Sequence, residues 1–112
     1  MLQRECNGAP GFQVFSACPP SHAADPVTYL ECVREVARWS EEAGCQGILV
    51  YTDNRLVDPW LVSAAIMQAT ERLAPLVALQ PAYIHPYAAT MVAAMAVVYG
   101  RRVHINLLAG GF

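Results

Sequence analysis

The chain has 112 residues, which limits it to a single domain, and its net charge at neutral pH is -2. Because 55% of the residues are hydrophobic and only 14% are charged, the chain is not disordered, and its charge gives no reason to expect a nucleic-acid partner. The longest apolar run outside the predicted helices is about the length of a strand, so we expect no membrane partner. The first residues lack the apolar core of a secretory signal, so we expect a cytoplasmic protein.

The first half of the chain alternates strand and helix signals. Residues 12–17 (FQVFSA) form a short apolar run that predicts a strand, and a loop rich in proline follows. Asp25 and Pro26 begin a helix, because aspartate caps free N–H groups and proline suits the first helical position. Gly44 fits the left-handed position that ends this helix. Residues 47–51 (GILVY) are continuously apolar, which predicts a second strand that is buried on both faces.

The second half repeats the same order. Residues 58–59 (DP) carry the same helix-start signal, and this helix is predicted to reach about Arg72. Residues 75–80 (PLVALQ) predict a third strand, and residues 86–100 predict a third helix that a proline opens and a glycine closes. Residues 103–108 (VHINLL) predict a fourth strand.

The order β-α-β-α-β-α-β predicts an α/β fold whose parallel strands are joined by right-handed crossovers. The periodicity fits either part of a (β/α)8 barrel or a small open doubly wound sheet. An open sheet normally finishes with a fifth strand or a covering helix, whereas this chain finishes on a strand. We therefore favour the N-terminal part of a (β/α)8 TIM barrel. Residues 1–112 would form one partial domain, with residues 1–11 as an irregular N-terminus.

Candidate functional residues follow the strands, because ligands bind at the carboxyl ends of parallel strands. His22 is a candidate acid or base, although the sequence favours a solvated loop histidine. His85 fits a helix cap, and His104 fits a satisfied core or inter-layer histidine. The glycines 110–111 either let a flat ring or a phosphate approach or form a plain turn. At the opposite end we interpret residues such as Arg101 as ordinary turn residues.

The cysteines are Cys6, Cys18, Cys32 and Cys45. No pair has the C-x-x-C spacing and no histidine completes a zinc pattern, so we expect reduced structural thiols and no metal. Cys18 follows a strand and is a candidate nucleophile, but no adjacent base is identifiable.

Several spaced motifs point to one family. They are G-x-L-x-x-T at residues 47–52, D-x-W-L-V at 58–62, T-x-R-L at 70–73, L-V-A-x-x-P at 76–81 and NLLAGG at 106–111. Over residues 12–112 the chain resembles the luciferase-like flavin-dependent monooxygenases, and within them the alkanesulfonate monooxygenase branch. The resemblance implies a (β/α)8 barrel that binds reduced FMN, or a deazaflavin, at the carboxyl ends of its strands. It also implies oxidation of a small organic substrate through a flavin peroxide, with a separate flavin reductase as partner.

The resemblance also implies site residues. The expected flavin contacts are Thr52, Asn106, Ala109 and Gly110. His22 matches a histidine of the first loop with loose spacing, which makes it the weak catalytic candidate. Gln80 stands where the alkanesulfonate enzymes carry an arginine, so it is the candidate substrate residue, although it lacks the charge that suits a sulfonate. Leu56 occupies a position where the family often has a cysteine.

Two alternatives stay open. The phosphate-binding loops of the family lie in its second half, so we expect 112 residues to be about a third of the barrel and inactive alone. The chain could instead be a non-catalytic, self-associating α/β barrel fragment, because uncovered strand edges favour pairing; in either case we expect a homo-oligomer. A small nucleotide-binding domain using residues 110–111 is weaker, because no G-x-G-x-x-G follows the first strand.

Overall fold

The computed structural model describes residues 11–21, 25–51, 57–79 and 88–108 of the protein. The elements run β1 (Phe15–Ala17), α1 (Pro26–Glu42), β2 (Gly47–Val50), α2 (Pro59–Ala69), β3 (Ala74–Leu79), α3 (Ala88–Tyr99) and β4 (His104–Leu107). This is the predicted alternation of strands and helices.

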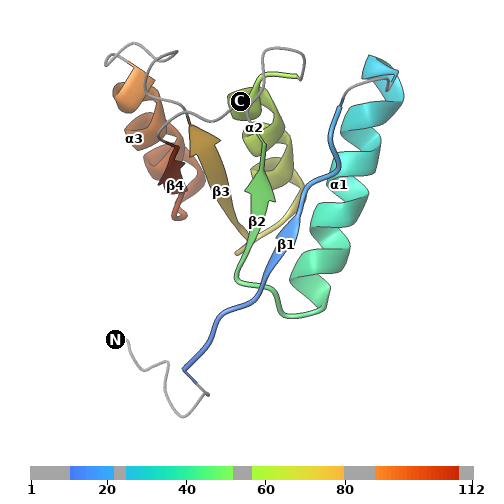
Figure 1. Ribbon diagram of the computed structural model, residues 1–112, viewed down its shortest axis with the longest axis horizontal. Helices are drawn as coiled ribbons and strands as arrows, with labels where there is room; N and C mark the ends of the chain where they lie inside the picture. The colour runs from blue at the N-terminus through green and yellow to red at the C-terminus, as the bar shows by residue number, and fades with distance from the viewer. Residues whose placement is uncertain (1–10, 22–24, 52–56, 80–87, 109–112) are drawn as a thin grey trace.

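The strands form a single parallel sheet in the order β1-β2-β3-β4. Each helix connects two neighbouring parallel strands, and right-handed crossovers that all advance in one direction place every helix on the same side. Figure 1 looks onto the side of the sheet that the helices leave uncovered. A sheet covered on one face, with its strands in sequential order, is the arrangement of the first strands of a (β/α)8 barrel. The predicted fold class is confirmed.

The hydrophobic core lies between the sheet and the helices. Val33 and Ala37 of α1 and Ile66 of α2 are fully buried against Ile48 of β2 and Val77 of β3. On α1 the core residues recur at helical spacing, and on β2 and β3 the core residues stand two positions apart. Each of these elements therefore turns one face towards this core. This core fixes the strands, and the strands in turn fix the residues on the uncovered face.

The predicted starts of the first two helices are confirmed, whereas the third, at Pro86, lies outside the described residues. The Asp25 carboxylate accepts the N–H of Val27 at 3.0 Å, and the Asp58 carboxylate accepts the N–H groups of Trp60 and Leu61 at 3.2 and 3.3 Å. Gly44 adopts a φ of 93°, as expected for the residue after a helix end.

Two predicted boundaries are wrong by three residues. Helix α2 ends at Ala69 and does not reach Arg72, because Thr70 is extended and its hydroxyl donates to the carbonyl of Ile66 at 2.7 Å. Strand β1 begins at Phe15, three residues later than predicted, since Phe12 is exposed and lies outside the sheet.

Candidate functional site

The uncovered face of the sheet, here called the inner face, is defined by strand register. In parallel strands the paired residues project to the same side, and successive residues alternate between sides. Ile48, Val50, Val77 and Leu79 point to the helices, so their neighbours occupy the inner face. The inner face consists of Phe15, Ala17, Gly47, Leu49, Ala74, Leu76, Ala78, His104 and Asn106.

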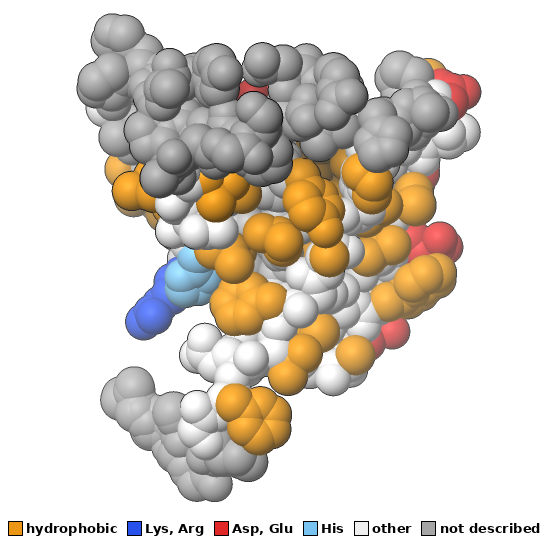
Figure 2. Space-filling view, viewed as in Figure 1, with side chains coloured by type: hydrophobic (Ala, Val, Ile, Leu, Met, Phe, Trp, Pro, Cys, Tyr) orange, Lys and Arg blue, Asp and Glu red, His pale blue; other side chains and the backbone are white. Residues whose placement is uncertain are grey.

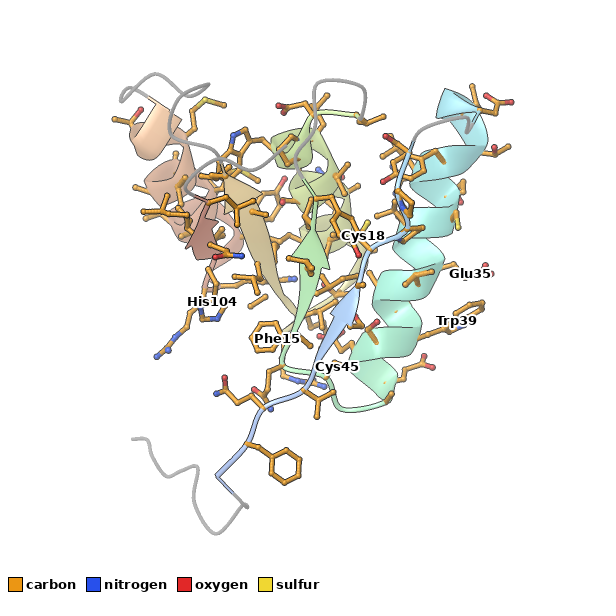
Figure 3. The ribbon with its side chains drawn as sticks, viewed as in Figure 1. Phe15, Cys18, Glu35, Trp39, Cys45 and His104 are labelled. Carbon is orange, nitrogen blue, oxygen red and sulfur yellow. The ribbon has the colours of Figure 1, made fainter. Side chains whose placement is uncertain are left out.

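An aromatic pair closes the lower, amino-end part of the inner face. The rings of Phe15 and His104 meet edge to face, with centroids 5.8 Å apart and planes at 72° (Figure 3). The Phe15 ring lies over Gly47, where a Cβ atom would meet both this ring and the carbonyl of Ala74. The prediction of a core or inter-layer histidine is therefore wrong for His104, which lies half-buried on the inner face.

Level with His104 and beyond it, towards the carboxyl ends of the strands, the side chains of the inner face are mostly aliphatic. Figure 2 shows hydrophobic side chains across this side of the molecule. Leu49 pairs with Leu76, and Ala78 pairs with Asn106 on β4. The Asn106 side chain is exposed, so its amide is free to meet a ligand on this face. Among the described residues, the inner face thus offers a mostly apolar surface with one amide near its carboxyl end.

The loop after β1 is held by its own hydrogen bonds. The Tyr29 hydroxyl of α1 donates to the carbonyl of Pro19 at 2.7 Å, and Ser21 Oγ accepts the N–H of Val57 at 2.6 Å. Ser21 is buried, so this bond joins the loop after β1 to the segment that leads into α2. Ser21 and Val57, which belong to the first two strand-to-helix connections, are therefore fixed relative to each other at the carboxyl end.

Cys18 begins this loop and is a structural thiol. Its side chain is buried, and its sulfur lies 3.8 Å from the Tyr29 hydroxyl. Burial raises the pKa of the Cys18 thiol to about 11, although the contact with Tyr29 acts in the opposite direction. A catalytic thiol needs a lowered pKa, so the nucleophile interpretation is wrong and the structural one is confirmed.

Cys18 is expected to resist alkylation in the folded protein. At pH 8 the raised pKa leaves about 100-fold less thiolate on Cys18 than on an ordinary thiol, and burial blocks access as well. Exposed Cys32 serves as the internal control. Iodoacetamide labelling followed by peptide mass spectrometry should show Cys32 modified at least about 100-fold faster, with Cys18 reacting after denaturation. Labelling of both thiols at similar rates in the native state would contradict this account.

Of the site residues that the family resemblance implies, Asn106 is the one within the described part of the chain. It lies on the inner face, at the carboxyl half of β4, where the resemblance expected a flavin contact. The other predicted site residues lie outside the described residues; they are His22, Thr52, Gln80, Ala109 and Gly110.

At the amino ends of the strands, Glu41 and Arg101 form hydrogen bonds to the turn between α2 and β3. We call this set of hydrogen bonds the brace; the sequence analysis did not predict it. Glu41 near the end of α1 accepts the backbone N–H groups of Glu71, Arg72 and Leu73, the first and last at 3.0 Å. Burial raises the pKa of Glu41, but these three donors lower it more, so its pKa lies below the usual value.

Arg101 completes the brace from the other side. Its guanidinium donates to the Thr70 hydroxyl at 2.7 Å and to the Thr70 carbonyl at 2.5 Å. The interpretation of Arg101 as an ordinary turn residue is therefore wrong. The partners lie about 30 residues apart in sequence, so no local pattern could have indicated them.

Within the described ranges, no helix is long and apolar enough to cross a membrane. The same part of the chain contains no group of three or more histidine, cysteine or acidic side chains able to hold a metal ion.

Comparison with known proteins identifies the family. The model of the luciferase-like monooxygenases matches residues 12–112. The chain belongs to the luciferase-like monooxygenase family. A curated relative in Niallia circulans is named 4-(gamma-L-glutamylamino)butanoyl-[BtrI acyl-carrier protein] monooxygenase BtrO; it is 37% identical over 83 residues. That alignment covers 73% of this chain and 24% of the relative, so the luciferase-like chain spans about a quarter of the relative's length.

Proposed function

We propose that this chain forms one side of the barrel of a flavin-dependent monooxygenase, with reduced FMN bound at the carboxyl end of the inner face. The observation that carries the proposal is the inner face itself, which the described helices leave uncovered, which is mostly apolar and which ends in the exposed amide of Asn106. Family membership over residues 12–112 supports a monooxygenase reaction. A deazaflavin is the alternative cofactor.

The described residues fit the ring of a flavin better than its phosphate. The Asn106 amide can both donate to and accept from a heterocycle, and its neighbour Ala78 on β3 has a small apolar side chain. The described arginines lie elsewhere, on α1 or at the amino ends of the strands; they are Arg34, Arg38, Arg72, Arg101 and Arg102. The phosphate would accordingly be held by other parts of a complete barrel, where the loops after late strands commonly bind phosphate.

The inner face also suits the proposed chemistry. A bound reduced flavin supplies the electrons that activate oxygen for monooxygenation. The aliphatic residues Leu49 and Leu76 would keep water away from the reacting region, and the Phe15–His104 pair would close its floor. We propose a small organic substrate, with an alkanesulfonate as one candidate, delivered to an enzyme that a flavin reductase supplies with reduced flavin.

The test is an anaerobic titration with reduced FMN of the natural gene product that contains these 112 residues. Replacing Asn106 with alanine should weaken binding by about tenfold, the effect of losing one or two hydrogen bonds. Gln46→Ala is the matched control, because this exposed amide lies at the opposite end of the sheet. Equal affinity of the Asn106 variant and the wild type, or no binding of reduced FMN at all, would overturn the proposal. A parallel titration with a reduced deazaflavin decides between the two cofactors.

A second candidate, the self-associating fragment, rests on a different observation. Large apolar side chains are exposed along the flank made by α3 and β4, including Val97 at 80% and Leu107 at 68%. Such a flank favours association with another protein surface. Sedimentation of the 112-residue chain tests it, because a stable monomer at tens of micromolar would exclude self-association.

A further inference from the structure

A cavity lies at the amino ends of the strands, away from the proposed flavin position. Its volume is about 350 Å³, within the range of small-ligand pockets. Its walls come from the segments before each of the four strands, so the sheet itself holds the cavity in place. The lining residues are Gln13, Gln46, Glu71, Arg72, Ala74, Gly100, Arg101, Arg102 and His104.

The lining of this amino-end cavity favours an anion. Three arginines and one glutamate line it, and two glutamine side chains add neutral hydrogen-bond donors. Figure 2 shows a histidine side chain and basic side chains next to each other at the left of the view. The nearby carboxylate of Glu41 accepts three backbone N–H groups. The cavity therefore carries a net positive charge.

One arginine of the cavity is fixed by hydrogen bonds within the protein, and the other two are free to bind a ligand. Both terminal nitrogens of Arg101 donate hydrogen bonds to Thr70. The Nε atom of Arg101 is buried and has no hydrogen-bond partner among the described residues. Arg72 and Arg102 are exposed, and neither side chain forms an ion pair within the described ranges. A buried donor without a partner costs free energy unless a ligand or water satisfies it.

From this geometry we propose that the amino-end cavity binds a small oxyanion of the phosphate or sulfate type, either free or carried by a small organic group. Arg72 and Arg102 would contact the oxyanion directly, and Arg101 would orient the cavity wall through its bonds to Thr70. Guanidinium groups suit this role because their planar donors match the oxygens of phosphate. The site is separate from the flavin position, which lies at the other end of the strands.

The experiment compares two double variants that remove the same charge. Arg72→Gln/Arg102→Gln removes the cavity arginines, whereas Arg34→Gln/Arg38→Gln removes two arginines from α1. For each protein, calorimetry measures the affinity for inorganic phosphate and for ribose 5-phosphate at constant ionic strength. Thermal unfolding in phosphate and in chloride gives an independent readout. We expect the cavity variant to bind at least one probe tenfold more weakly or worse, and the α1 variant to bind as the wild type does.

Two results would overturn the proposal. One is the absence of binding of either probe by the wild type above the chloride background. The other is an equal loss in both double variants, which would mean general charge attraction. Tighter binding of inorganic phosphate would indicate a free oxyanion as the ligand, and tighter binding of ribose 5-phosphate would indicate an oxyanion carried on an organic group. We expect the cavity variant to keep its affinity for reduced FMN, because the two sites lie at opposite ends of the strands. A failure of the oxyanion proposal can therefore be distinguished from a failure of the proposed function.

Discussion

Replacing Gly47 with alanine is expected to lower the free energy of unfolding by about 3 kcal/mol, at the upper end of the usual cost of overpacking. The added methyl group would meet the ring of Phe15 and the carbonyl of Ala74 at the same time. The Ala74 carbonyl belongs to the neighbouring strand β3, so it cannot move without disturbing the sheet. Urea denaturation followed by circular dichroism measures the effect.

Gly11→Ala is the matched control for this prediction. A methyl group at Gly11 meets nothing within 4 Å, and no strained backbone angle is involved. The control should change stability by less than about 0.5 kcal/mol. Adding Phe15→Ala to Gly47→Ala should leave much of the loss in place, because the clash with the Ala74 carbonyl persists. A Gly47→Ala protein as stable as the wild type would show that β1 and β2 do not pack as described.

Replacing Glu41 with alanine should lower the free energy of unfolding by about 2 kcal/mol at pH 7, as expected for lost hydrogen bonds to a charged acceptor. The change leaves the N–H groups of Glu71, Arg72 and Leu73 without their acceptor at the turn between α2 and β3. Glu42→Ala is the matched control, since the neighbouring carboxylate is exposed. An equal loss of unfolding free energy in Glu41→Ala and Glu42→Ala would contradict the stabilising role assigned to Glu41.

The effect of Glu41 should also depend on pH. Because its pKa is lowered in the folded state, its contribution is fully present above the pKa of the unfolded chain and is lost as the pH falls through the lower folded value. The difference between wild type and Glu41→Ala should therefore shrink in the acid range below about pH 4. Denaturation curves at several pH values measure this; a difference that stays constant down to pH 2 would contradict the assigned role.

Local sequence signals predicted the elements but not all of their ends. Asp25 and Asp58 begin helices because aspartate followed by proline meets a local requirement of the first helical turn, which needs no distant partner. The early end of α2 at Ala69 was not predictable in the same way. It depends on Thr70 turning away and on Arg101, which comes from the segment before β4.

The candidate site was predictable in part. The family resemblance named Asn106 as a flavin contact, and the strand register then showed that Asn106 lies on the inner face, while its role as a flavin contact stays a prediction. The contact between Phe15 and His104 joins the two outer strands and has no local signature. Gly47 looked like an ordinary strand start, because the ring that requires a glycine there comes from another strand.

The most direct test of the flavin proposal is hydrogen exchange of the natural gene product with and without reduced FMN under anaerobic conditions. We predict slower amide exchange at the carboxyl end of the sheet, in residues 49–51 and 105–108, and unchanged exchange at the amino end, in residues 43–47 and 100–103. Protection confined to the amino end, or no protection at saturating reduced FMN, would contradict the account that the inner face of this sheet holds the flavin.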